Sequence, residues 1–457
     1  MDNDTSIFLE GNAGCVSPGG AESRMEGPPP EGFSKRVRLL PILFFFTYLN
    51  LTVFLFAFGP WDWPVISGTK LYAFLALAHL ALLLGYLSAA FRPPQGYYGK
   101  WKIDRIIAVS LTVNLLLFLP TSAFRTGSSI PDIAQGLEDP GQVYFDSNAW
   151  RALGGGPVEY IRILAGPVLF LLLPLSIFYW HRLKTITKMM VCLYIVAYLS
   201  MYIATGTNKG IADFVLLFPC LIVARRCAGF FKANRRRMVM AIAIGLALFC
   251  LFLSFFTVGQ ISRAGTGSSW GYFAMTGTSA DTDSFLVRDL PDQAAIGVLS
   301  LSSYVTQGYY ALYLSLDEPF VPMFGVGNST FLYLNAARLT GMPEIAEMPY
   351  PVRLQNRGTW DAYVNWSTIY PWIASDVSFP GTILVVFLIG RLFALAWLDT
   401  LKGINPYAVG AFAQFLIMLF YFPANNQVLQ TGEALTSFCG VLALWLVTRR
   451  NHVLRIA

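Results

Sequence analysis

Long runs of uncharged, apolar residues constrain the fold of this chain more than any other feature of its sequence. Several of these runs are long enough for a helix of roughly 20 residues, which crosses about 30 Å of membrane hydrocarbon. Only 13% of the 457 residues are charged, and 55% are hydrophobic. Soluble proteins carry roughly 25% charged residues. The sequence therefore predicts an all-α, polytopic membrane protein.

Hydropathy predicts ten membrane helices, at residues 39–59, 71–91, 106–121, 162–180, 189–205, 211–226, 239–258, 379–398, 405–422 and 434–448. A further stretch, residues 294–316, is long and fairly apolar. As an eleventh crossing it would invert the side of every later segment. We therefore prefer a helix that lies at the outer surface or re-enters the protein, which membranes tolerate when its backbone is buried. Two further crossings in the same region, for a total of twelve, would also preserve the sides.

The distribution of Lys and Arg predicts which side of the membrane each loop faces. Cytoplasmic loops carry an excess of these residues, and that excess falls inside if both termini are cytoplasmic. Basic cytoplasmic loops also explain the net charge of +6, which requires no nucleic-acid partner. The chain then divides into a disordered cytoplasmic tail (1–34), a transmembrane bundle (35–258) with an outer loop (122–161), a large outer segment (259–378) and C-terminal helices (379–457).

The cysteines and histidines give no support for a metal site. None of the six cysteines has the spacing of a metal ligand set or of a disulfide framework. The histidines lie outside the large outer segment, at His79, His181 and His452. We therefore expect no metal and no cofactor.

The segment TGTNKG (205–210) separates two predicted spans and places Lys209 at the outer membrane boundary. Thr207 or Asn208 can cap the following helix. The first amides of that helix favour an anion, and a lysine beside them strengthens such a site. Two simpler interpretations remain open. Lys209 could anchor lipid head groups, or it could pair with Asp213, one turn further on.

The large outer segment contains five arginines, no lysine and no histidine. The planar donor fork of arginine suits phosphate, although these arginines could equally pair with the many acidic residues of the segment. The segment is also rich in Trp, Tyr and Asn, notably in NRGTWDAYVNWSTIYPW (356–372). Aromatic faces stack on sugar rings while amides bind hydroxyls. An interfacial aromatic belt is the alternative explanation.

Several features resemble the Wzy-type oligosaccharide repeat-unit polymerases of bacterial O-antigen, capsule and exopolysaccharide pathways. They are the polytopic layout with a large late outer loop, TGTNKGIADF (205–214), GYYALYLSL (308–316) and NWSTIYPWIASDVSFPGTIL (365–384). In the last passage the family's Asn, Thr, Asp and Gly correspond to Asn365, Thr368, Asp376 and Gly381. The family's Phe-Gly after the aspartate is Val377-Ser378 here, which is a departure.

This resemblance implies a membrane glycosyltransferase of the GT-C kind in the bacterial inner membrane. Such an enzyme transfers a growing glycan from undecaprenyl diphosphate to a single lipid-linked repeat unit at the periplasmic face. Its partners would be undecaprenyl-diphosphate-linked oligosaccharides and membrane lipid, with a chain-length regulator and a flippase as further candidates. Arginines can stabilise the diphosphate leaving group without a metal.

The candidate site residues follow from this interpretation. The diphosphate-binding candidates are Lys209, Arg263, Arg353 and Arg357, of which Arg353 and Arg357 share a face if their segment is helical. The catalytic candidates are Asp376, Asp361 and Arg263, with Asp376 favoured as general base by the resemblance. The glycan-binding candidates are Tyr309, Tyr310, Trp360, Asn365 and Trp366.

Three other functions remain open. An O-antigen ligase has a similar layout, but ligases as a family carry a functional histidine in the outer loop, and this loop has none. A lipid-linked oligosaccharide transporter would need polar helix interiors, whereas the predicted helices are nearly free of charge. A non-catalytic assembly protein of polysaccharide export is the third alternative.

Overall fold

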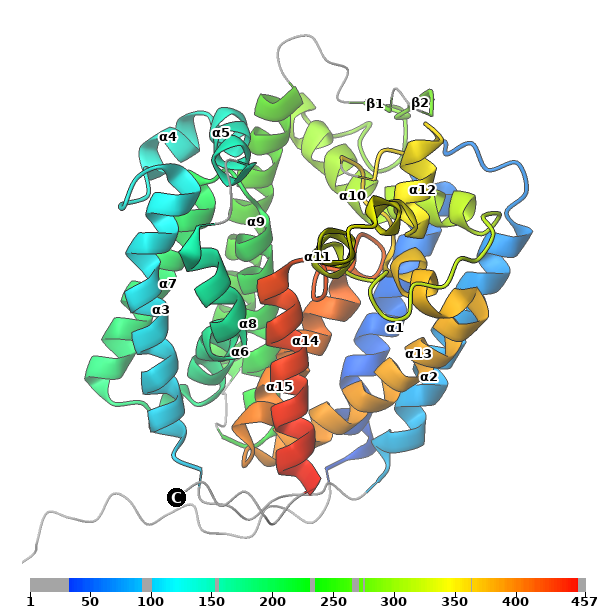
Figure 1. Cartoon of the computed structure of the whole chain (residues 1–457). Helices are drawn as coiled ribbons and strands as arrows, with labels where there is room; N and C mark the ends of the chain where they lie inside the picture. Colours follow the sequence, from blue (N-terminus) through cyan, green and yellow to red (C-terminus); the bar gives the residue numbers. More distant parts are fainter. Residues whose placement is uncertain are drawn as a thin grey trace, which may run out of the picture.

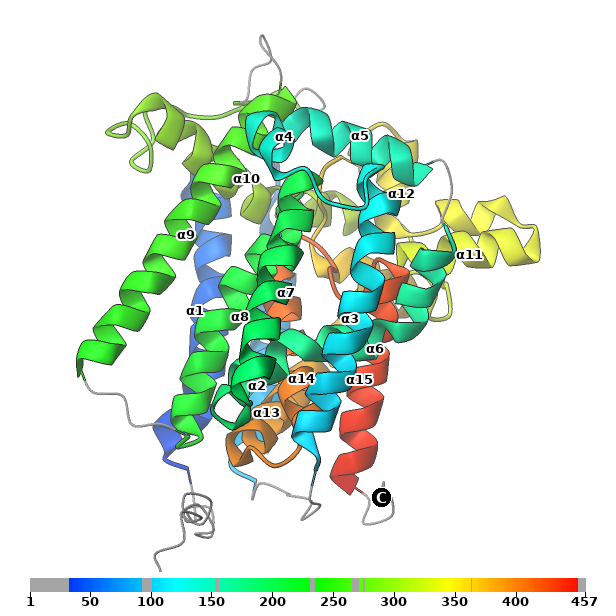
Figure 2. The same cartoon turned by 90° about the vertical axis from the view of Figure 1, so that its left-hand side faces the viewer.

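The computed structural model describes residues 33–92, 101–152, 156–230, 235–264, 271–273, 276–362 and 364–450. Residues 1–32, which make up most of the predicted tail, lie outside these ranges. Most of the described chain is helical, and its long helices stand side by side in one bundle (Figures 1 and 2).

Each of the ten predicted spans overlaps a helix. These helices are α1 (Lys35–Phe58), α2 (Thr69–Ala90), α3 (Ile103–Thr126), α6 (Pro157–Phe178), α7 (Thr185–Ala204), α8 (Lys209–Cys227), α9 (Arg235–Ala264), α13 (Ile369–Lys402), α14 (Pro406–Tyr421) and α15 (Gly432–Arg450). We call the end of the bundle where α1 begins and α15 ends the terminal end, and the opposite end the far end (Figure 1).

Within the described residues, seven helices are long and apolar enough to cross a membrane, namely α1, α2, α3, α6, α7, α9 and α13. The chain therefore has the build of a multi-pass membrane protein. The other three helices fall short for identifiable reasons. Helix α14 has only 16 residues, while α8 and α15 carry charged residues at their ends. A total of ten crossings stays a prediction.

Close backbone contact joins α2 to α13 at one side of the bundle (Figure 1). A Cβ at Gly85 would lie 2.0 Å from the Phe387 carbonyl oxygen, and one at Gly390 would lie 2.2 Å from the Leu82 carbonyl oxygen. Small residues let membrane helices approach this closely, and van der Waals packing then holds them together. These two glycines therefore explain why two helices far apart in the sequence cross in direct backbone contact.

The far end carries the long helix α10 and several short elements (Figure 1). They are α4 (Ile133–Glu138), α5 (Pro140–Ala152), β1 (Tyr272–Phe273), β2 (Thr278–Ser279), α10 (Asp292–Ser315), α11 (Thr330–Thr340), the 3₁₀ helix η2 (Pro343–Glu347) and α12 (Tyr350–Asn356). Another 3₁₀ helix, η1 (Trp180–Arg182), follows α6 at the terminal end. The same hydrophobic core as that of the long helices includes Leu299, Tyr309, Tyr310, Ala311 and Leu312 of α10 and Leu354 of α12. A small second core contains Met323, Tyr333, Val352 and Trp372.

Helix α10 corresponds to the apolar stretch at 294–316 and lies across the far end. A third of the way along α10, the Leu299 carbonyl accepts a hydrogen bond from Trp61 at 3.2 Å. Just after its end, Asp317 pairs with Lys70 at 2.6 Å. Both contacts are made with residues at or beside the connection between α1 and α2, so the two ends of α10 lie at the same end of the bundle. This geometry favours the surface or re-entrant helix over an eleventh crossing.

Helix α13 is kinked at Ser378. This residue has φ 64° and ψ 168°, which interrupts the helical geometry, and Pro380 follows two positions later. Such a backbone conformation is essentially restricted to glycine and is strained for other residues. The predicted span at 379–398 therefore lies entirely after the kink, and the first part of α13 belongs to the far end.

Candidate functional site

The connection between α7 and α8 is shaped by two glycines. Gly206 has φ +58°, and a Cβ there would lie 2.1 Å from the Pro140 carbonyl oxygen. A Cβ at Gly210 would lie 2.1 Å from the ring of Tyr202. Glycine at the first position gives the turn its left-handed backbone and lets α5 pack directly over it. Glycine at the second lets the Tyr202 ring lie against the start of α8.

Lys209 is the first residue of α8. Its Nζ lies 2.5 Å from Oδ2 of Asp213, and the lysine side chain is 40% exposed while the aspartate side chain is 11% exposed. The pairing considered from the sequence is thus present. Asn208 occupies the N-cap position without a side-chain capping bond to the first amides of α8.

Arg263, near the end of α9, reaches the same connection. One of its Nη atoms donates a hydrogen bond to the Gly206 carbonyl, and its guanidinium carbon lies 3.9 Å from the centre of the Tyr144 ring. Its Nε is buried without a hydrogen-bond partner among the described residues. Arg263 therefore holds α5, α9 and the α7–α8 connection together, close to Lys209.

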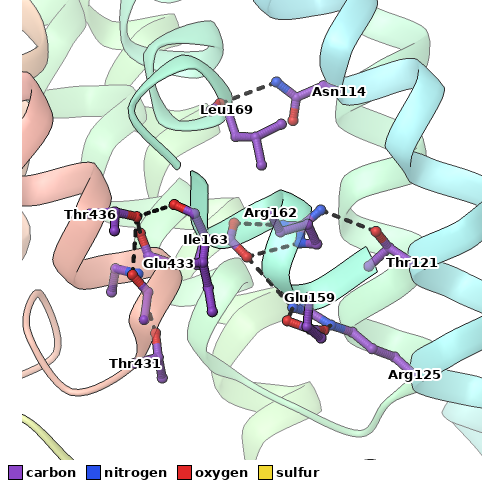
Figure 3. A network of polar contacts seen from close by, with 12 residues as sticks. Asn114, Thr121, Arg125, Glu159, Arg162, Ile163, Leu169, Thr431, Glu433 and Thr436 are labelled. Carbon is purple, nitrogen blue, oxygen red and sulfur yellow. Dashed lines mark hydrogen bonds and ion pairs between the residues drawn. The ribbon is translucent and has the colours of Figure 1, made fainter. Parts of the chain in front are cut away.

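A half-buried ionic network, with side chains 15–27% exposed, joins α3, α6 and α15 (Figure 3). Arg162 forms a two-point contact with Glu433 at 2.6 and 2.8 Å. Arg125 binds Glu159 at 3.0 Å and lies 3.6 Å from Glu433. Arg162 also donates to the hydroxyl of Thr121 at 3.2 Å. Glu433 is within electrostatic reach of Lys209, so the network and the lysine belong to one polar region.

We call this region the connection cluster. Its members are Arg125, Glu159, Arg162, Lys209, Asp213, Arg263 and Glu433. It contains four cations and three carboxylates, and Arg263 makes no ion pair with any residue in the described part of the chain. The cluster therefore has one surplus positive charge and can attract an anion. Sequence reasoning missed its members from α3, α6 and α15, although charges at the ends of apolar spans were the available signal.

Among the predicted glycan-binding residues, Trp366 is connected to the connection cluster by a chain of contacts. Its half-buried ring packs edge-on against Tyr304, with ring centres 4.7 Å apart, and lies 6.3 Å from the ring of Tyr421. Tyr421 is in turn within electrostatic reach of Asp213. Gln260, on α9, donates to the Tyr304 hydroxyl at 3.2 Å. An aromatic ring and the amide of Gln260 are therefore part of this chain of contacts. The neighbouring Asn365 is half-buried.

The other predicted glycan-binding aromatics are packed inside the protein. Tyr309 and Trp360 are fully buried, and the Tyr309 hydroxyl shares a 2.8 Å hydrogen bond with Thr52. Tyr310 stacks on Trp63 at 5.7 Å, and Trp360 lies against both rings. Their ring faces are covered in this structure, so they stabilise the junction of α10 with the α1–α2 connection.

Arg353 and Arg357 lie at a different place on the far end. Both contact the buried carboxylate of Glu318, with Arg353 at 3.6 Å, and Arg353 also covers the ring of Tyr350 at 4.5 Å. The expectation of a shared face is met, because Arg353 lies in α12 and Arg357 caps it. Because both arginines pair with the same glutamate, this geometry agrees with the simpler interpretation, in which the arginines pair with acidic residues and stabilise the outer segment.

Asp376 lies just before the kink in α13, with its carboxylate occupied by one loop. One oxygen accepts the amides of Gly325 and Gly327, both at 2.8 Å. The other accepts the backbone and side-chain amides of Asn328 at 3.0 and 2.7 Å. Four donors leave little of this carboxylate free to act as a general base.

The second predicted base, Asp361, caps a turn. It accepts the amide of Val364 at 3.1 Å through its side chain and that of Asn365 at 2.7 Å through its carbonyl. These capping bonds of Asp361, like the four bonds of Asp376, are made outside the connection cluster. Among the residues that the structure describes, no group of three or more His, Cys, Asp or Glu side chains could hold a metal ion.

Comparison with known proteins finds no relative of this chain. The chain matches no protein-family model, no curated protein and no solved structure.

Proposed function

We propose that the protein is a polysaccharide polymerase of the membrane glycosyltransferase kind. It transfers a growing glycan from undecaprenyl diphosphate to the non-reducing end of a lipid-linked repeat unit. The observation that carries this proposal is the meeting of Lys209 and Arg263 at one connection, joined through Asp213 and Tyr421 to the ring of Trp366.

The chemistry of the transfer suits these groups. A hydroxyl oxygen of the acceptor attacks the anomeric carbon of the donor, and the bond between that carbon and the diphosphate oxygen breaks. The electron pair leaves with the diphosphate, whose growing negative charge Lys209 and Arg263 stabilise. Asp213 is the carboxylate of the connection cluster that contacts no arginine among the described residues, which supports its assignment as the acceptor of the hydroxyl proton.

The location of the charged groups favours a reaction at one membrane surface over passage through the bundle. The connection cluster lies at the ends of α3, α6, α8, α9 and α15. A second buried ion pair, Asp399 with Arg449 at 2.7 Å, lies at the terminal end. Between these two levels the described residues form no ion pair, and the buried His79 of α2 contacts the neutral Asn50. Transport paths usually pair their ionisable groups inside the membrane. We assign the far end to the periplasm, because the Lys and Arg excess predicts a cytoplasmic terminal end.

The experiment that tests this function mixes purified full-length protein with undecaprenyl-diphosphate repeat units, without nucleotide sugar and with a chelator present. We expect a ladder of products spaced by one repeat unit. Unchanged substrate, with folded protein and the correct repeat unit verified, would contradict the proposal. Transfer to lipid A in place of a ladder would favour the ligase, and movement of intact substrate across a vesicle membrane would favour the transporter.

A pair of arginine variants connects the activity to the site. Arg263→Ala is expected to lower the rate of ladder formation by about 100-fold, the usual effect of removing one group that stabilises developing negative charge. Arg288→Ala is the matched control, because the Arg288 side chain is 62% exposed and pairs with its neighbour Asp289. Equal rates for the two variants would place the diphosphate elsewhere.

A further inference from the structure

Among the helices long enough to cross a membrane, α9 is the one that the rest of the described chain covers least. Only 11% of its apolar window is buried, against 56% for α2, α6 and α13. Its far end is packed, because the ring centres of Phe256 and of Tyr304 on α10 are 5.2 Å apart. Its terminal end stands apart from α1 and α8 in Figure 2. Helix α9 therefore joins the bundle at one end and leaves it toward the other.

The terminal half of α9 is exposed on opposite faces. Phe249 is 43% exposed, and Leu251, two residues later, is 68% exposed. Two residues in an α-helix are about 200° apart around its axis, so these two side chains lie on nearly opposite faces. The stretch 243–251 includes no buried residue. The face that α9 turns toward the bundle is therefore uncovered at this level, as its outer face is.

The side of α9 that carries Arg263 changes from packed to open along the helix. Residues seven apart in an α-helix lie on nearly the same face, two turns from each other. Arg263, Phe256 and Phe249 are spaced in this way. Phe256 is 3% exposed, whereas Phe249 is 43% exposed. At a rise of 1.5 Å per residue, this open position lies about 21 Å from the level of Arg263.

The same change occurs on α8, on the side that carries Lys209. Leu216 and Val223 follow Lys209 at intervals of seven residues, so all three lie on nearly one face. Leu216 is half-buried, and Val223 is 45% exposed. Val223 lies about 21 Å from the level of Lys209, which equals the separation between Phe249 and Arg263. The two cations therefore stand at the far end of two apolar sides that open at matching distances.

Two cations at the end of two apolar sides fit a lipid with an anionic head and a long hydrocarbon chain. The surplus positive charge of the connection cluster attracts the head. Arg263 donates to the carbonyl of Gly206, three residues before Lys209, so α8 and α9 meet where the head would bind. Ordinary lipid chains can also cover the apolar sides, but a chain whose own head is bound by the cations is held in register with them. These features favour a lipid diphosphate over a neutral lipid.

We propose that the polyprenyl chain of the lipid-linked donor lies along these two apolar sides of α8 and α9, while its diphosphate binds Lys209 and Arg263. The identity of the lipid rests on the proposed function. The chain extends from the far end toward the terminal end and contacts Phe249 and Val223 about 21 Å from the cations. Because the terminal half of α9 is uncovered, the lipid enters from the side of the bundle.

Binding of two diphosphates that differ in chain length tests this proposal on the full-length protein. Native mass spectrometry in detergent measures the dissociation constants of undecaprenyl diphosphate and geranyl diphosphate. The geranyl chain is only about 10 Å long, since its carbon–carbon bonds are about 1.5 Å each, and does not reach Phe249. We expect Phe249→Ala to weaken binding of undecaprenyl diphosphate about fivefold, as loss of one aromatic contact does, and to leave binding of geranyl diphosphate unchanged. Leu251→Ala, on the opposite face, is the matched control and should change neither.

The results that would overturn this proposal differ from those that would overturn the proposed function. Equal weakening of both diphosphates by Phe249→Ala would give Phe249 a structural role, and unchanged binding of undecaprenyl diphosphate would place the chain elsewhere. Equally tight binding of phosphatidylglycerol would make this a site for ordinary lipid, and a dimeric mass that Phe249→Ala removes would make a second copy the occupant. Val223→Ala repeats the comparison on α8 if Phe249→Ala folds poorly. A missing product ladder together with chain-dependent binding would contradict the polymerase alone.

Discussion

Replacement of Asp376 by asparagine is expected to destabilise the protein by about 3 kcal/mol. The carboxylate accepts four N–H groups, two on each oxygen, at 2.7 to 3.0 Å. Asparagine keeps one oxygen and sets an amide NH₂ against the two donors of the other. Each hydrogen bond to a charged group contributes about 1.5–3 kcal/mol, and the lower figure applies because the site is partly exposed.

The assay is unfolding of the purified protein in mixed micelles, followed by helix content as the denaturing detergent is increased. The control is Asp289→Asn, since this side chain is 85% exposed and surface substitutions change stability by less than about 0.5 kcal/mol. Unchanged stability of Asp376→Asn together with a large loss of polymerisation would refute the reasoning. That outcome would restore Asp376 as the general base that the family resemblance favours.

Three further predictions concern the fold and the site. Ser378→Gly should raise stability by about 1 kcal/mol in the same assay, because relief of roughly 1–3 kcal/mol of backbone strain exceeds the entropy cost of glycine, whereas Ser378→Ala should give no gain. Glu433→Gln should lower stability by about 3 kcal/mol, because it removes the carboxylate that pairs with Arg162, whose side chain is 15% exposed. A loss of stability smaller than that of a surface variant would contradict this prediction. The hydrogen bond from Ser262 holds the pKa of Asp139 below its ordinary value of 3.8. The hydrogen bond between Asp139 and Ser262, which joins α5 to α9, should therefore be fully present above pH 3.8 and be lost as pH falls through the lowered pKa of Asp139. Hydrogen exchange of the α5 amides measures this loss. Asp139→Asn should remove the pH dependence.

The sequence predicts the long helices of this protein well, because each is a local pattern. The positions of the ten apolar runs, and the helix at 294–316, need no knowledge of distant residues. The start of α13 at Ile369 was missed because the turns before the kink are aromatic and mixed in polarity. The positive φ at Ser378 is a backbone conformation that favours glycine, and no local pattern in the sequence indicates it.

The connection cluster could be predicted only in part. Lys209 and Asp213 are four residues apart on one helix, and their pairing follows from helix geometry. Arg162 and Glu433 are 271 residues apart, and no local pattern connects them. The same limit separates Trp366 from Trp360, because composition marks both as aromatic whereas only the packing of the bundle buries Trp360 completely.

The central claim is that Lys209 binds the diphosphate of a lipid-linked glycan, and a pair of lysine variants tests it most directly. Lys209 and Lys70 each lie in the first turn of a helix at the far end and each contact an aspartate, at 2.5 and 2.6 Å. The measurement is the initial rate of ladder formation by Lys209→Met and Lys70→Met at equal amounts of folded protein. The account predicts a loss of about 100-fold for Lys209→Met and a rate close to that of the unmodified protein for Lys70→Met. Equal rates in the two variants would contradict it.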